Sequence, residues 1–242
     1  MTCRDVKANT SQPKLIECAP NIRSASFVSW GVENDRFFGG FGECKKLERL
    51  DLGGTRFRGF PTLPKTLKHL NVSANSGLCH GEGVDLRLLE LPLLETFIFG
   101  RNSDKSSELL AHFLGTAISA GTLKHLEILY LPDFLALFPS ADFSMSSLKV
   151  LRIIDCQEPE DVLLSFLRRC TSLRRLALES TKVTGVGVKE VMTKGSGPLE
   201  YLSLINCTAV SPDAIAWARS KGTVVECHAS HVPGKRYCLN GL

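Results

Sequence analysis

A pattern of three apolar residues recurs along the chain, and this recurrence constrains the fold more than any other feature. One copy is clear at Leu173, Leu176 and Leu178, which follow the spacing L-x-x-L-x-L. The alternation at its end has the period of a β-strand, and residues 187–192 downstream have the spacing of a helix. One such unit cannot bury its own apolar face, so neighbouring units must stack to form a core.

Eight copies of this strand pattern align along the chain. Their apolar positions are Ile22, Ala25 and Phe27; Leu47, Leu50 and Leu52; Leu67, Leu70 and Val72; Leu94, Phe97 and Phe99; Leu126, Leu129 and Leu131; Leu148, Leu151 and Ile153; Leu173, Leu176 and Leu178; and Leu199, Leu202 and Leu204. The central positions are separated by 25, 20, 27, 32, 22, 25 and 26 residues, which predicts an insertion between the fourth and fifth copies. Most separations fall within the about 20–29 residues of a leucine-rich repeat. We therefore predict an α/β leucine-rich-repeat solenoid, with a curved, parallel inner sheet of about eight strands and irregular helices and turns outside.

A small polar residue follows most copies, three positions after the last apolar residue of the strand. These residues are Thr55, Asn75, Asn102, Cys156, Thr181 and Cys207. We expect their side chains to turn inward and to bond backbone groups that the bending chain would otherwise leave buried and unpaired. The fifth copy has Phe134 at this position and fits the pattern least well.

The remainder of each repeat is expected on the convex side of the sheet. Helices are predicted over 108–119, 159–169 and 211–220, and a last strand over 223–227 is expected to cover the open edge of the sheet. We divide the chain into a flexible segment 1–13, a leucine-rich-repeat domain 14–227 and a flexible tail 228–242.

Composition narrows the class of protein. The net charge of +4 is too small to imply a nucleic-acid partner. Residues 1–13 contain no apolar core of a signal peptide, and the most apolar run, 126–138, is too short to span a membrane. The nine cysteines form no C-x-x-C pair and suit reduced thiols. We therefore expect an intracellular protein, cytoplasmic or nuclear, and interpret the N-x-S/T matches at Asn9, Asn71 and Asn206 as chance.

The sixth to eighth copies resemble the cysteine-containing, ribonuclease-inhibitor-like class of leucine-rich repeats. The residues that carry the resemblance are the run from Cys170 to Leu178 and the strand and turn from Leu204 to Ser211. The ending over 214–222, followed by an apolar strand, is similar to that of many fungal F-box proteins. This resemblance covers about residues 15–227. It implies the substrate-recognition part of a Skp–cullin–F-box ubiquitin ligase receptor, with ligase subunits as further partners of a fuller chain. The F-box itself is expected to be absent, because only about fourteen residues precede the first copy.

No catalytic motif is present, so we predict a protein that is not an enzyme and needs no cofactor. A zinc-binding or hydrolytic protein that uses Cys227, His228, His231 and Cys238 is a weaker alternative, because their spacing matches no standard zinc finger. Four arginines around Cys170 could contact an acidic partner or phosphate, or could simply be solvated. They are Arg168, Arg169, Arg174 and Arg175.

The strands give the best indication of a binding surface. Alternation sends the residues between the apolar positions to the face away from the core, here called the concave face. The predicted protein-binding residues are Arg49, Asp51, His69, Asn71, Ile98, Tyr130, Arg152, Ile154, Arg175, Glu179, Tyr201, Ser203 and Ile205, and Ile128 is expected beside them. Tyr130, Tyr201 and Arg152 are the expected anchors. A stand-alone repeat protein with no role in ubiquitin transfer remains the main alternative, and a register slip of one residue would exchange the two faces.

Overall fold

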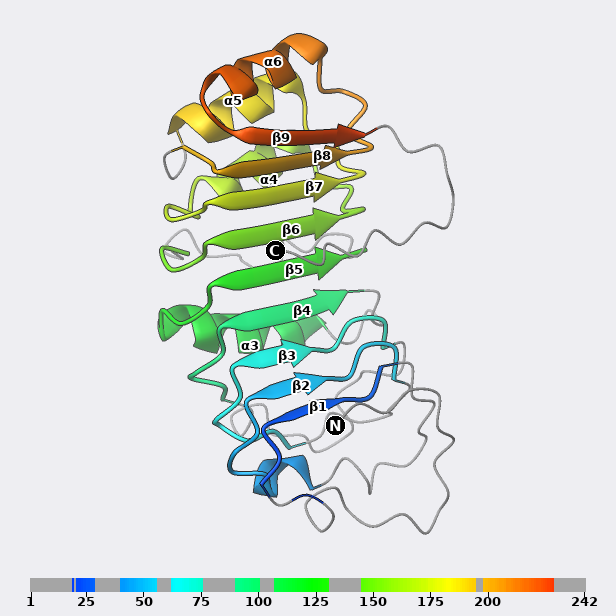
Figure 1. Cartoon of the computed structure of the whole chain (residues 1–242), viewed down its shortest axis with the longest axis vertical. Helices are drawn as coiled ribbons and strands as arrows, with labels where there is room; N and C mark the ends of the chain where they lie inside the picture. The colour runs from blue at the N-terminus through cyan, green and yellow to red at the C-terminus, as the bar shows by residue number, and fades with distance from the viewer. Residues whose placement is uncertain are drawn as a thin grey trace.

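The computed structural model describes residues 19, 21–28, 40–55, 62–75, 90–100, 107–130, 145–194 and 198–228, apart from the side chains of 107–111 and 194. Within these residues, nine strands form one parallel sheet, and their order across the sheet is their order in the sequence (Figure 1). The strands are β1 Ser24–Ser26, β2 Arg49–Asp51, β3 His69–Asn71, β4 Thr96–Gly100, β5 His125–Leu129, β6 Val150–Ile154, β7 Arg175–Glu179, β8 Tyr201–Ile205 and β9 Val224–His228. The predicted solenoid is therefore confirmed, with the predicted last strand as β9.

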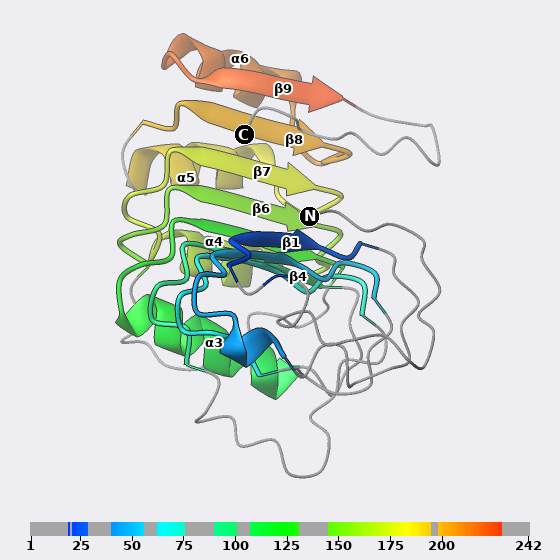
Figure 2. The same cartoon turned by 60° about the horizontal axis from the view of Figure 1, so that its bottom comes forward.

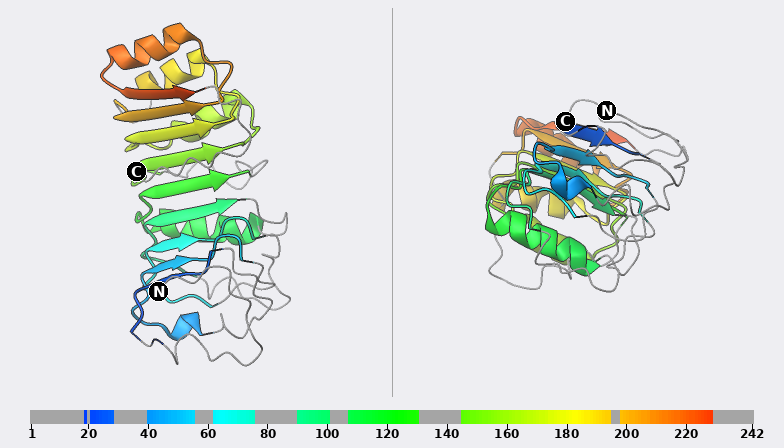
Figure 3. Two further views of the ribbon diagram at one scale, coloured as in Figure 1. Left: turned by 45° about the vertical axis from the view of Figure 1, so that its right-hand side comes forward. Right: turned by 90° about the horizontal axis from the view of Figure 1, so that it is seen from below.

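The described α-helices lie on one side of this sheet, as the views in Figures 2 and 3 show. They are α3 Ser107–Ser119, α4 Glu160–Leu167, α5 Gly185–Lys194 and α6 Pro212–Ser220, and a short 3-10 helix, η1, spans Phe41–Glu43. Ser211 caps α6 as predicted, because its side chain accepts a hydrogen bond from the Ala214 N–H. In the described part of the chain, each helix is too short or too polar to cross a bilayer.

The core lies between the sheet and the helices, where the apolar residues of the strands form two continuous rows. One row contains Leu151, Leu176 and Leu202, which are aligned on neighbouring strands and at most 1% exposed. Burying a leucine side chain contributes about 1.5–3 kcal/mol. Packing along these rows therefore holds each repeat to its neighbours.

The fifth copy begins three residues earlier than the sequence prediction placed it. β5 aligns Leu126 with Leu151 and Ile128 with Ile153, so its apolar residues are Leu123, Leu126 and Ile128, all at most 1% exposed. The sequence satisfies the pattern in both registers, which caused the error. In the correct register the central positions are 29 and 25 residues from their neighbours, so the predicted insertion is wrong.

Four of the predicted polar turn residues bond the backbone where their strand ends, namely Thr55, Asn75, Cys156 and Cys207. Thr181 contacts the thiol of Cys207, and Asn102 lies outside the described residues. The hydroxyl of Thr55 donates to the Leu52 carbonyl over 2.6 Å, and Asn75 Nδ2 donates to the same carbonyl over 2.9 Å. Farther along, the thiol of Cys207 donates to the Leu178 carbonyl over 3.4 Å. Asn75 and Cys207 thus link their turns to the preceding repeat, whereas Thr55 bonds a carbonyl of its own repeat. The prediction for these three residues is confirmed.

A left-handed residue stands two positions after the last inward apolar residue in six repeats. These residues are Gly54, Ala74, Tyr130, Asp155, Ser180 and Asn206, with φ between 51° and 71°. Each donates its backbone N–H to a carbonyl of the following repeat over 2.7–2.9 Å. We call this set the left-handed ladder. It turns the chain out of the sheet at the same point in each of these repeats.

Candidate partner-binding face

The concave face is the side of the sheet opposite the helices, turned toward the viewer in Figure 1. Its side chains form rows that run across the strands, because the strands are in register and about 4.8 Å apart. The central row contains Asp51, Asn71, Ile98, Glu127, Arg152, Ala177, Ser203 and Glu226. Side chains from distant parts of the sequence are therefore direct neighbours.

The predicted residues lie on strand positions of this face, with one exception. Tyr130 is in the left-handed ladder, after the end of β5, and so does not occupy a strand position. Ile128, expected beside it, is buried in the core. In their place β5 contributes His125, Glu127 and Leu129, which the sequence prediction missed because of the three-residue slip.

A cluster of charged side chains occupies the centre of the face. Arg152 reaches Glu127 on one neighbouring strand and Glu179 on the other, with an N–O distance of 3.5 Å in both cases. His125 Nε2 lies 3.0 Å from the other oxygen of Glu127. The four side chains are 15–25% exposed, so water screens them less than it screens a surface pair. We call them the central cluster.

Glu127 is the least exposed member of the central cluster. Burial alone would raise the pKa of its carboxyl group, but the close contact with His125 and the charges of His125 and Arg152 outweigh burial. The pKa of Glu127 is therefore lower than usual, and the side chain is ionised at neutral pH. Its negative charge holds Arg152 in a fixed position across β5 and β6.

A second polar group lies at the C-terminal end of the face. The Tyr201 hydroxyl donates to Glu226 on β9, and Ser203 Oγ lies 3.5 Å from the same oxygen. His228 Nε2 is 3.5 Å from the other oxygen of Glu226. Burial, followed by the hydrogen bond to Glu226, raises the pKa of Tyr201 and keeps the phenol protonated. The predicted anchor Tyr201 is thus held by its neighbours.

The N-terminal end of the face uses its polar side chains to hold its own turns. Asp51 Oδ1 accepts from the Gly53 N–H over 3.0 Å, and Asn71 Oδ1 accepts from the backbone and the hydroxyl of Ser73 over 3.0 and 2.8 Å. Burial, followed by the charge of Arg49, lowers the pKa of His69. At this end of the face, polar side chains therefore support the turns after β2 and β3.

The apolar residues predicted on the face are less exposed than expected. Ile154 and Ile205 are each 7% exposed, and Ser203 is 1% exposed. Val224 on β9, which the prediction did not include, is 64% exposed. A partner would therefore meet mainly polar and charged atoms at the centre of the face and an apolar side chain at its C-terminal end.

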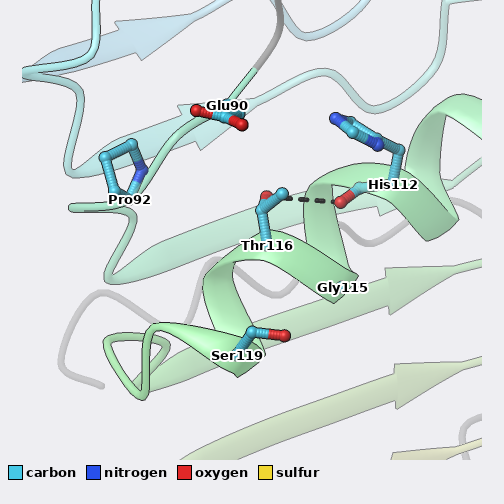
Figure 4. Close-up of a pocket in the computed structure, with 6 residues that line it drawn as sticks. All are labelled: Glu90, Pro92, His112, Gly115, Thr116 and Ser119. Carbon is cyan, nitrogen blue, oxygen red and sulfur yellow. Dashed lines mark hydrogen bonds between the residues drawn. The ribbon is translucent and has the colours of Figure 1, made fainter. Parts of the chain in front are cut away.

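The opposite side of the molecule has a shallow pocket beside α3 (Figure 4). Its volume is about 410 Å³, and it is lined by Glu90, Pro92, His112, Gly115, Thr116 and Ser119. The Thr116 hydroxyl donates to the carbonyls of His112 and Phe113 within its own helix. The hydroxyl of this lining residue is thus directed to its own helix.

The zinc alternative can be tested only in part. Cys227 aligns with the inward Leu204 and His228 with the outward Ile205, so the two side chains point to opposite faces of β9. His231 and Cys238 lie outside the described residues, as do residues 1–13 and 229–242 of the predicted flexible segments, whereas His228 is the last residue of β9. Among the residues that the structure does describe, no group of three or more His, Cys, Asp or Glu side chains could hold a metal ion.

The four arginines around Cys170 do not form one cluster. Arg168 makes an ion pair with Glu190 on the helical side of the molecule. Arg175 is the first residue of β7, on the concave face, and Arg174 is exposed directly before that strand. Arg168 and Arg175 therefore do not share one site, because they lie on different sides of the molecule.

Comparison with known proteins found similar folds among solved structures but no match by sequence. No protein-family model and no curated protein sequence matches the chain. The structure is similar to that of human 5T4, also called Wnt-activated inhibitory factor 1 or trophoblast glycoprotein, with a TM-score of 0.52 and 16% identity over 93% of this chain and 84% of that chain. It is also similar to a chain of the octameric complex of Latrophilin 3, Unc5D and FLRT2 (LRR), with a TM-score of 0.54 and 16% identity over 96% of this chain and 70% of that chain.

These structures correct the expected location of the protein. One is of a glycoprotein, and the other is of a repeat protein in complex with Latrophilin 3 and Unc5D. Both point away from an intracellular protein, so the prediction of a cytoplasmic or nuclear location is wrong. That prediction rested on the lack of an apolar core in residues 1–13 and on the number and spacing of the cysteines. The repeat pattern, the parallel sheet and the two similar structures show that the chain is an α/β leucine-rich-repeat solenoid.

Proposed function

We propose that this protein is a non-enzymatic scaffold that binds a protein partner on its concave face. The observation that carries the proposal is the central cluster, in which Arg152 is held between Glu127 and Glu179 on the side of the sheet opposite the helices. Charged side chains that are already oriented and partly shielded from water lose little entropy when a partner contacts them. They also select against partners of the wrong charge.

The repeat architecture supports this role. Nine in-register strands among the described residues hold the side chains of the face at fixed spacings. The similar FLRT2 (LRR) structure was obtained in a complex with other proteins, Latrophilin 3 and Unc5D. A protein partner is thus a known use of this fold, and the identity of the partner of this chain is a matter for experiment.

Substitutions that preserve shape test the proposal best. Glu179→Gln removes a charge from the central cluster, and Tyr201→Phe removes the hydroxyl that bonds Glu226. Lys189→Gln, on α5, is the control on the opposite side of the molecule. Partners would be captured by proximity labelling in the source cells and then titrated as purified proteins, with circular dichroism to verify folding.

The proposal predicts that Glu179→Gln and Tyr201→Phe each weaken binding about tenfold or more, equivalent to about 1.4 kcal/mol. Lys189→Gln should bind as the wild type does. If the helical variant abolishes binding and both concave variants retain it, recognition takes place on the other side and the proposal is wrong.

A ubiquitin-ligase receptor is the second candidate, favoured only by the cysteine-containing repeat pattern. Cys170 and Cys207 are buried at the turns of their repeats, as that class resemblance requires. The comparisons give no support to this role. Depleting the protein from its source cells should lengthen the half-life of the captured partner if the partner is a ligase substrate. An unchanged half-life would favour the stand-alone scaffold.

A further inference from the structure

A charged side chain stands directly before each strand from β1 to β8, and these side chains form a rim along the end of the sheet where the strands begin. The members of this strand-start rim are Arg23, Glu48, Lys68, Glu95, Lys124, Lys149, Arg174 and Glu200. Each member from Glu48 onward donates its backbone N–H to the carbonyl of the preceding member over 2.8–2.9 Å. The rim is therefore continuous, and successive side chains are neighbours.

The signs of the charges alternate along the first part of the rim. Glu48 lies between two cations, 3.3 Å from Arg23 and 3.7 Å from Lys68. Glu95 in turn pairs with Lys124 over 3.0 Å. Opposite charges on adjacent strands stabilise a sheet, whereas like charges destabilise it.

The alternation ends at Lys149, where the next residue in the pattern would be an acid. Lys124, Lys149 and Arg174 are three consecutive cations of the rim, and Arg175 adds a fourth charge at the start of β7. Lys149 and Arg174 are exposed, and no carboxylate of the described residues forms an ion pair with either. Such a break in a favourable local pattern is expected where a site serves function instead of stability.

We propose that these cations are the docking point for an acidic segment of the protein partner, which enters the concave face across the start of β6 and β7. This inference rests on the proposed function and adds the chemistry of the partner. Three adjacent strands span about 10 Å, which suits two or three carboxylates on an extended chain, where alternate side chains are about 7 Å apart. The guanidinium groups of Arg174 and Arg175 can each bind a carboxylate through two parallel hydrogen bonds.

The length of the patch favours an acidic polypeptide over a nucleic acid. Glu95 lies on one side of the cations and Glu200 on the other, so the positive stretch is only three repeats wide. A nucleic-acid backbone carries a charge every few ångströms along its whole length and would meet these glutamates. A short acidic segment can end before it reaches them.

The charge pattern provides a matched pair of variants. Lys149→Glu restores the alternation, so it should raise the melting temperature by about 1–4 °C while it removes the docking charge. Lys68→Glu changes the same residue type on the same rim, but in the paired part next to Glu48. It should lower the melting temperature and leave docking unchanged.

The probe is a fluorescein-labelled peptide of alternating Glu and Ser residues, compared with the same peptide containing Gln in place of Glu. Fluorescence anisotropy is measured at ionic strengths of about 0.01 M and about 1 M. The Glu peptide should bind at low salt only, and Lys149→Glu and Arg174→Glu should each weaken its binding at least about tenfold. Equal binding by these variants and the wild type, or by the Gln peptide, overturns the inference.

The captured partner separates this inference from the proposed function. If Glu179→Gln weakens binding of the partner but Lys149→Glu does not, the concave face is the binding surface and the acidic docking point is wrong. If Lys149→Glu weakens binding and the concave variants do not, the docking point stands and the proposed use of the concave face fails.

Discussion

Replacing Ala74 with glycine should stabilise the protein, although alanine-to-glycine changes usually destabilise proteins. Ala74 belongs to the left-handed ladder, with φ of 58°, and its side chain is exposed. A left-handed conformation costs an L-residue about 1–2 kcal/mol, and glycine avoids this cost. Glycine in turn loses about 0.5–1 kcal/mol more conformational entropy on folding than alanine does. The net gain is therefore about 0.8 kcal/mol, within a range of about 0–1.5 kcal/mol.

Urea denaturation followed by circular dichroism measures this gain as a rise in the midpoint at an unchanged slope. Ala216→Gly is the matched control, because Ala216 is also exposed but lies inside α6, where glycine costs about 1 kcal/mol. The backbone hydrogen bond from Ala74 to the Gly100 carbonyl, 2.7 Å long, remains possible in the variant. If Ala74→Gly lowers the midpoint as much as Ala216→Gly does, the argument from backbone conformation is wrong.

Three further predictions concern Gly100, His69 and Cys170. Gly100→Ala should cost about 3 kcal/mol or more in a denaturation experiment, because the added Cβ would lie 1.8 Å from the Leu129 carbonyl oxygen at a φ of 124°. The free energy of unfolding should fall as the pH drops through about 6.5, because His69 binds a proton in the unfolded chain more readily than in the folded protein, where its pKa is lowered. In thermal melts, His69→Gln should reduce this pH dependence. Cys170, whose pKa burial raises to about 12, should react with a thiol reagent only after unfolding, and rapid labelling of the native protein would contradict its buried position.

The fold could be predicted from the sequence because the same strand pattern recurs in eight copies. The error in the fifth copy shows the limit of that reasoning. Leu126 belongs to two overlapping matches of the pattern, one beginning at Leu123 and one beginning at Leu126 itself. Only the pairing of β5 with its neighbours selects between them. The correct register spaces the central positions by 29 and 25 residues, whereas the predicted register spaces them by 32 and 22. Preferring the more even spacing could have identified the correct register from the sequence.

That one error also concealed the central cluster. In the correct register Glu127 is directly opposite Arg152, and the ion pair could have been predicted from strand pairing. The left-handed ladder was harder to predict from the sequence. Its residues other than glycine are alanine, tyrosine, aspartate, serine and asparagine, which share no chemistry that predicts a positive φ. Its cause is the hydrogen bond that each residue donates to the next repeat, a property of position instead of residue type.

The turn residues differ chemically between the two ends of the molecule, so the two ends should differ in their sensitivity to oxidation. Near the N-terminus the carbonyls are bonded by Thr55 and Asn75, whereas near the C-terminus cysteines take this place in the sixth and eighth copies, at Cys156 and Cys207, with Thr181 in the seventh. Hydroxyl and amide groups resist peroxide, but a thiol gains an oxygen atom for which a buried turn has no room. Peroxide reaches these thiols only when a repeat opens. Without a reducing agent, the working life of a purified sample should therefore be set by how often its C-terminal repeats open.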